Sequence, residues 1–227
     1  MSSLRFSDPQ TVADFRTFVS RARAADDGAI RLQSNGTVLA AWVCSMRPRL
    51  LGEGTPTILG LRTMALVEHI NAGPTDSEQS DIGLDCTVPL AAVADRLARL
   101  HETDTELPIP TVTVNESWAA LSAPRADWRP EIELAADQLI AVAKEGVREI
   151  AQIIPVNPGA LIVNNARAAV WGRDMPGLSG LPGGAAFAGY ALGFWRSGEH
   201  ITFYRSGRWI RLSSAHGHVL VRPPSTL

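Results

Sequence analysis

The chain has 227 residues, of which 45% are hydrophobic and 19% charged, and this composition excludes the class of disordered proteins that combine low hydrophobicity with high charge. A formal net charge of −2 supplies no overall basic field to hold a polyanion, so we expect nucleic acid to be an unfavourable partner. Two cysteines cannot build a disulfide framework, and no apolar run reaches the length of a bilayer span, so we expect a cytoplasmic protein without a membrane partner.

Arginine is strongly preferred over lysine in this chain. Lys144 is the only lysine among the 21 basic residues, and the sequence is rich in Ala, Gly and Pro. This bias is typical of bacterial genomes of high G and C content, so we expect a bacterial protein.

The N-terminal quarter predicts a helix followed by three strands. Asp8 and Pro9 form a helix start, and the apolar residues after them recur at spacings of three and four: Val12, Phe15, Val19 and Ala22. Asn35 and Gly36 predict a tight turn between strands at 29–34 and 37–45, which places Leu32 opposite Leu39 and Ile30 opposite Ala41. A third strand is predicted at about 57–67.

The next segments predict an exposed acidic loop at 71–84 and a second helix at 88–100, which Thr87 caps. The polar segment at 101–110 is the best candidate for a boundary. We therefore expect an N-terminal half at 1–103 and a C-terminal half at 104–227, packed as one compact unit.

The C-terminal half begins with a short predicted strand at 111–114 and a loop at 116–130 that contains Trp118 and Trp128. A helix is predicted from Pro130 to about Ile154, with an irregularity at Gly146, and a strand follows at about Ala160. A glycine-rich loop at 176–184 precedes a helix of small residues at 185–194, whose glycines allow close packing. That loop is also a candidate anion cradle near Arg173.

The last segment predicts a three-stranded antiparallel meander. Turns at 206–207 and 215–216 place one set of apolar side chains on a single face: Ile201, Phe203, Ile210, Leu212, Val219 and Val221. The opposite face carries polar and aromatic side chains in two rows, His200 with Ser213 and His218, and Tyr204 with Trp209 and Arg222. The predicted fold is thus α+β, with mainly antiparallel sheets, helices packed on one face and two α-β-β-β-like halves.

The polar face of this meander is the predicted site. Its residues for binding an anionic ligand are Tyr204, Trp209 and Arg211, with Arg173 and Trp128 from other segments. A serine beside histidines also allows a catalytic row of His200, Ser213 and His218. The His216-x-His218 pair, joined by His200, is an alternative metal site. In this register, however, His216 lies in the turn and His200 is two strands from His218, so we expect neither metal nor cofactor. Coverage of the face by another segment or subunit is the simplest alternative.

Two functions remain open at this stage. The first is a non-enzymatic cytoplasmic binding or interaction protein that self-associates. The second is a hydrolase or transferase that acts on a small anionic substrate through His200, Ser213, His218 and Arg211.

Overall fold

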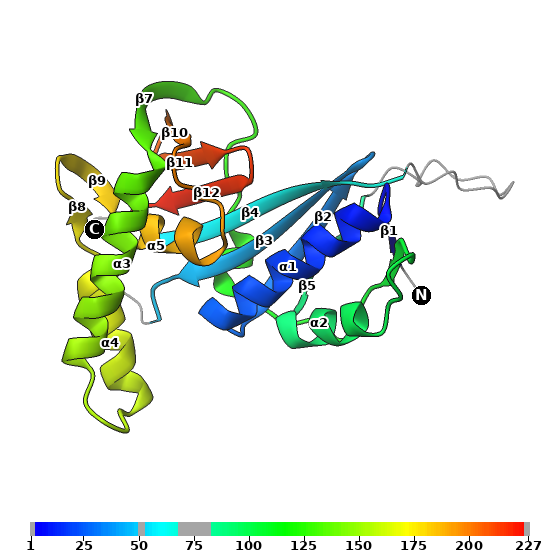
Figure 1. Ribbon diagram of the computed structural model, residues 1–227, viewed down its shortest axis with the longest axis horizontal. Helices are drawn as coiled ribbons and strands as arrows, with labels where there is room; N and C mark the ends of the chain where they lie inside the picture. Colours follow the sequence, from blue (N-terminus) through cyan, green and yellow to red (C-terminus); the bar gives the residue numbers. More distant parts are fainter. Residues whose placement is uncertain (1–2, 50–52, 68–82, 225–227) are drawn as a thin grey trace, which may run out of the picture. The chain divides into compact units, whose positions relative to one another are not determined.

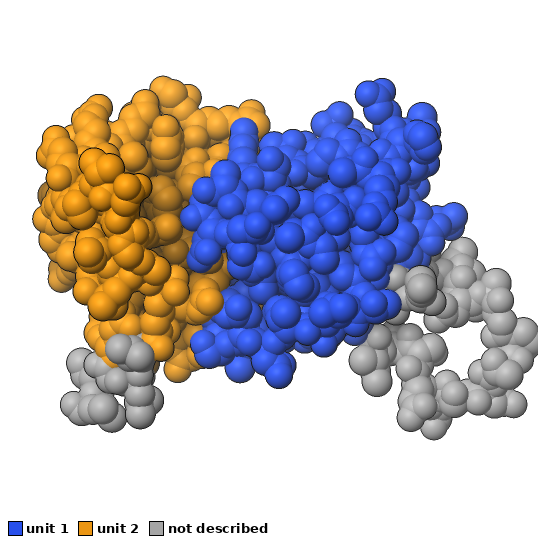
Figure 2. Space-filling view, turned by 90° about the horizontal axis from the view of Figure 1, so that it is seen from below, with its two compact units in different colours: residues 1–43, 62–120 blue, residues 44–61, 121–227 orange. Residues whose placement is uncertain are grey.

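The computed structural model describes residues 3–49, 53–67 and 83–224 and consists of two compact units. Unit 1 comprises residues 1–43 and 62–120, and unit 2 comprises residues 44–61 and 121–227 (Figure 2). Helices and antiparallel strands occur in both units, which confirms the predicted α+β class. The division at residue 103 stays a prediction.

Within its described residues, unit 1 contains two α-helices that pack side by side and strands of three to nine residues (Figure 1). Its elements are β1 Ser3–Arg5, α1 Pro9–Ala25, β2 Ala29–Asn35, β3 Val38–Met46, β4 Thr57–Ala65, β5 Asp85–Pro89, α2 Leu90–Ala98, β6 Glu106–Pro108 and a 3₁₀ turn at Ser117–Ala120. Strands β3 and β4 pass from one unit to the other, because residues 44–61 belong to unit 2. The strand order in unit 1 is β5-β2-β3, and β1 pairs with β6.

The first helix and hairpin follow their sequence signals. The Asp8 carboxylate accepts a hydrogen bond of 2.8 Å from the backbone N–H of Thr11 and so caps α1, whose apolar stripe is buried. In the hairpin, however, Leu32 lies opposite Ala41 and Ile30 opposite Val43, two residues away from the predicted pairing. The turn begins at Gly36, whose φ is +55°, and a shift of two residues leaves every side chain on its predicted face.

Two predictions in unit 1 are wrong. Thr87 lies in β5 and does not cap a helix, because α2 begins only at Leu90 after Pro89. The predicted strand at 111–114 has no regular structure, and Val114 instead donates its backbone N–H to the carbonyl of Thr87. Most of the acidic loop predicted at 71–84 lies outside the described residues.

Unit 2 combines a sheet with a protruding helical hairpin (Figure 1). Its elements are β7 Arg129–Ala135, α3 Ala136–Ile153, α4 Ala160–Trp171, β8 Asp174–Met175, β9 Leu178–Pro182, α5 Gly183–Ala191, β10 His200–Ser206, β11 Trp209–Ser214 and β12 Gly217–Arg222. The first five residues of β4 join this sheet, whose order is β4-β12-β11-β10-β7. Helix α5 contacts β12, α3 and α4 and so links the sheet to the hairpin.

Packing changes three predicted elements in unit 2. Residues 129–135 form an edge strand against β10, so the predicted helix begins at Ala136 and not at Pro130. Residues 160–171 form helix α4 and not a strand, since Ala166 and Val170, four positions apart, are both buried. Gly146 causes no irregularity in α3. Its missing side chain makes room for the Trp171 ring, which lies 2.1 Å from where a Cβ would be.

The C-terminal meander is present, and the six apolar side chains predicted to share its inner face are all buried. Between β11 and β12 the register is as predicted, with Ser213 opposite His218. Between β10 and β11 the turn begins at Gly207, whose φ is +54°, so that Tyr204 lies opposite Arg211. This shift of two residues again preserves the faces but changes the rows on the outer side.

Candidate functional site

The polar face of unit 2 is the outer side of β10, β11 and β12. We define it by Thr202, Tyr204, Arg211, Ser213 and His218. One row across the strands holds Thr202, Ser213 and His218, and the next holds Tyr204 and Arg211. Because residues two apart on a strand are separated by about 7 Å, the two rows lie within one side-chain length of each other.

The predicted catalytic row is only partly assembled. Nδ1 of His218 lies 2.9 Å from the Ser213 hydroxyl oxygen, which places this pair in hydrogen-bond contact. The placement of His200 in the same row is wrong, because His200 lies opposite Ala135 and Thr202 takes the position opposite Ser213. Catalysis by Ser213 and His218 stays a prediction, now without its third member.

His216 and His218, the alternative metal pair, contact different groups. Nε2 of His216 lies 3.0 Å from a carboxylate oxygen of Glu199, whereas His218 faces Ser213. Within the described ranges, no three or more His, Cys, Asp or Glu side chains group closely enough to hold a metal ion.

Arg211 lies between two aromatic rings. Its guanidinium carbon is 4.5 Å from the centroid of the Trp128 ring and 4.4 Å from that of Tyr204. Its Nε is buried and has no hydrogen-bond partner among the described residues. Burial lowers the pKa of Arg211, although the neighbouring Tyr204 opposes this effect. The arrangement holds a partly desolvated cation on the polar face.

Trp128 lies in the loop predicted at 116–130. Its indole N–H donates a hydrogen bond of 3.0 Å to the carbonyl of Pro124, and the preceding Asp127 has a φ of +61°. The loop therefore turns sharply and lays Trp128 over Arg211. Trp118 of the same predicted loop has a different role, because it is 2% exposed in unit 1.

Two of the predicted ligand-binding residues, Trp209 and Arg173, contact other side chains than those of this group. Trp209 is only 6% exposed, and the guanidinium of Arg222 lies 5.8 Å from its ring centroid. Arg173 pairs with Glu149 at 2.5 Å and donates to the carbonyl of Ala169 at 3.1 Å. The structure thus brings together Tyr204, Arg211 and Trp128 and leaves the other two outside this group.

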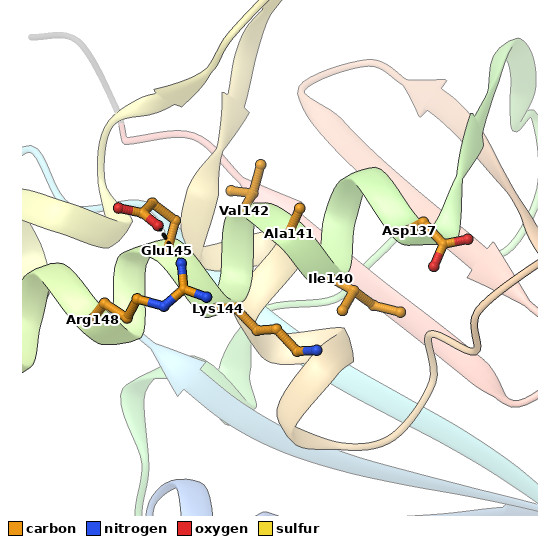
Figure 3. A pocket seen from close by; sticks show the side chains of 7 residues that line it. All are labelled: Asp137, Ile140, Ala141, Val142, Lys144, Glu145 and Arg148. Carbon is orange, nitrogen blue, oxygen red and sulfur yellow. Dashed lines mark hydrogen bonds and ion pairs between the residues drawn. The ribbon is translucent and has the colours of Figure 1, made fainter.

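Sequence reasoning missed a second surface, on the helical hairpin of α3 and α4. A shallow hollow of about 550 Å³ runs along α3, with walls of mixed apolar and charged side chains (Figure 3). Its charged members include Lys144 and the ion pair of Glu145 with Arg148. Beyond it, large apolar side chains at the hairpin tip are exposed: Ile153 50%, Val156 93%, Leu161 71% and Ile162 47%. The wrong assignment of residues 160–164 to a strand hid this signal.

Two family models match the chain in succession. Residues 1–120 match the domain of unknown function DUF8010, and residues 123–226 match the domain of unknown function DUF8185. Among curated proteins, none matches the chain. None of the helices in the described ranges combines the length and apolar character needed to cross a bilayer.

Solved beta clamps share the fold. The chain is similar to a protein of Eubacterium rectale assigned as a DNA polymerase III beta subunit (10% identity, TM-score 0.52, 99% of this chain and 66% of that one). Matches of the same kind are pol III beta of Caulobacter crescentus (10%, 0.50, 98% and 66%) and the beta clamp of Helicobacter pylori (10%, 0.52, 100% and 64%). The chain thus spans slightly less than two thirds of the length of these proteins.

The expectation that nucleic acid is an unfavourable partner is wrong. Solved structures with this fold are named as subunits of a DNA polymerase, so the fold occurs in proteins of nucleic-acid metabolism. The net charge also conceals an uneven distribution: unit 1 has 8 basic and 14 acidic residues, whereas unit 2 has 13 basic and 9 acidic residues. A net charge near zero over the whole chain therefore does not determine the electrostatic field at one surface.

Proposed function

The chain belongs to the DUF8010 family of unknown function, and we propose that it is a non-enzymatic interaction protein that associates with copies of itself. The observation that carries this proposal is the exposed apolar hairpin tip, made of Ile153, Val156, Leu161 and Ile162. Large apolar side chains clustered on a surface mark interaction sites more often than isolated ones do. The fold supports the same reading, since the similar Eubacterium rectale protein is named as a subunit of a polymerase.

A second copy of the chain is the partner that this tip suits best. Charges near it are already paired: Arg148 with Glu145 on α3 at 2.7 Å, and Arg173, which follows α4, with Glu149 on α3 at 2.5 Å. An apolar surface flanked by neutralised charges does not repel its own copy. A two-fold axis would place the same patch of both copies in contact, which is the commonest geometry of homo-oligomers.

The test compares two aspartate substitutions by sedimentation equilibrium. Leu161→Asp places a charge at the hairpin tip, and Val112→Asp is the matched control, because Val112 is 65% exposed in unit 1. We expect the unmodified chain and Val112→Asp to associate at micromolar concentration and Leu161→Asp to sediment as a monomer. A monomeric unmodified chain, or an association that Leu161→Asp leaves intact, would refute the proposal.

Nucleic acid is a second candidate partner, favoured by the basic excess of unit 2 and by the fold. We expect labelled duplex DNA to bind with an affinity that falls as salt rises, because phosphate contacts release counterions. Arg125 and Arg129 are exposed in unit 2, and Arg5 is exposed in unit 1. Replacing Arg125 and Arg129 by Glu should weaken the affinity for DNA several-fold, whereas Arg5→Glu should change the affinity less. Fluorescence anisotropy that detects no binding at low salt would exclude this candidate.

A further inference from the structure

Arg211 is a partly buried arginine whose Nε is buried without a hydrogen-bond partner among the described residues, and it has no anionic partner there. Arg31 pairs with Asp85 at 2.7 Å, and Arg62 pairs with Asp14 at 3.4 Å. No Asp or Glu within residues 3–49, 53–67 and 83–224 forms an ion pair with Arg211. Removing a cation from water without a counter-charge is unfavourable, and stacking on aromatic rings offsets only part of that cost. The site therefore retains an uncompensated positive charge.

The stacking also determines how a ligand can approach Arg211. Tyr204 and Trp128 lie over the guanidinium at 4.4 and 4.5 Å, and its Nε is buried. What remains for a ligand is the outer edge with the two terminal Nη groups. Two parallel N–H donors in one plane match the two oxygens of a carboxylate or a phosphate, which is the geometry of bidentate arginine contacts.

Further polar groups lie one row away on the same face. The Ser213 hydroxyl and the His218 ring are in hydrogen-bond contact at 2.9 Å, and Ser213 follows Arg211 by two residues on β11. At about 3.3 Å per residue, this spacing places the pair within reach of an anion held by Arg211. We infer that the polar face is a binding site for a small oxyanion, a phosphate or carboxylate group, held by the Arg211 edge and contacted by Ser213 and His218.

The inference is independent of self-association, because the hairpin tip contributes no residue to it. The probes are inorganic phosphate and sodium acetate, titrated separately into the full chain at constant ionic strength. Isothermal calorimetry measures binding, and tryptophan fluorescence provides a second signal because Trp128 stacks on Arg211. Saturable binding of phosphate alone would identify a phosphate site, and saturable binding of acetate alone a carboxylate site. If neither probe binds saturably, the proposal is overturned.

A pair of matched variants assigns the binding to Arg211. Arg211→Lys keeps the positive charge but loses the planar pair of donors, and we expect it to weaken the Kd of the bound probe about tenfold or more. Arg222→Lys makes the same change at the arginine that lies over Trp209, and the Kd should stay within about twofold. Equal affinities of Arg211→Lys and the unmodified chain would assign the binding to general salt effects and refute the site. Thermal melts of both variants establish that they are folded.

Discussion

Helix α5 offers a sharp test of the packing that supports the polar face. Gly189 lies on this helix, and a Cβ added there would be 1.9 Å from an atom of the Trp195 indole. The ring has little freedom to retreat, because Trp195 is 5% exposed and its N–H donates a hydrogen bond of 2.9 Å to the carbonyl of Ala186. Gly189→Ala should therefore destabilise unit 2, although alanine usually stabilises a helix relative to glycine by about 1 kcal/mol.

The size of the effect follows from two opposing contributions. Overpacking of a buried site costs about 1–3 kcal/mol, and loss of the indole hydrogen bond adds about 1 kcal/mol if the ring moves. After the gain in helix propensity, we expect a net loss of about 2 kcal/mol. For a chain of this length, that corresponds to a fall in Tm of roughly 4–8 °C.

The control is an identical substitution on the same helix. Gly183 begins α5, and a Cβ there would meet its nearest neighbour at an ordinary 3.7 Å. Gly183→Ala should melt at or slightly above the temperature of the unmodified chain, as followed by circular dichroism. If Gly189→Ala melts no lower than Gly183→Ala, the close contact between α5 and Trp195 is not as described and the reasoning fails.

Two further predictions concern titratable groups. The Arg31 guanidinium holds the pKa of the Asp85 carboxyl below its ordinary value, so the resulting stability is present above about pH 4 and is lost as pH falls through the lowered pKa. Melting temperatures measured against pH should therefore fall more steeply in acid for the unmodified chain than for Asp85→Asn, and parallel curves would contradict this. Burial raises the pKa of the Cys86 thiol, and Cys44 is buried, so a disulfide reagent at pH 8 should modify both at least about tenfold more slowly in the native chain than in urea. Rapid native modification of either thiol would show that its surroundings are more open.

The amphipathic patterns were sufficient to place side chains on faces. The stripe of α1 and the inner face of the meander were both predicted correctly, because burial of an apolar face depends on periodicity, which is local to each element. Two of the three predicted hairpin pairings, at Gly36 and Gly207, were wrong by two residues, and their faces were still correct because strands alternate with a period of two. The polar face and its Tyr204 and Arg211 could therefore be predicted from the sequence.

Contacts between distant segments could not be predicted in this way. Whether residues 160–171 form a strand or a helix depends on how Ala166 and Val170 pack in unit 2, and short apolar runs are ambiguous without that contact. Likewise, the stacking of Trp128 on Arg211 joins residues 83 positions apart through the turn at Asp127. Composition and periodicity determined the fold class and the faces, because those depend on each element alone. Tertiary packing decided that Arg211 was partly buried between aromatic rings without a counter-charge, and which apolar side chains stayed exposed at the hairpin tip, because both depend on the contacts between elements.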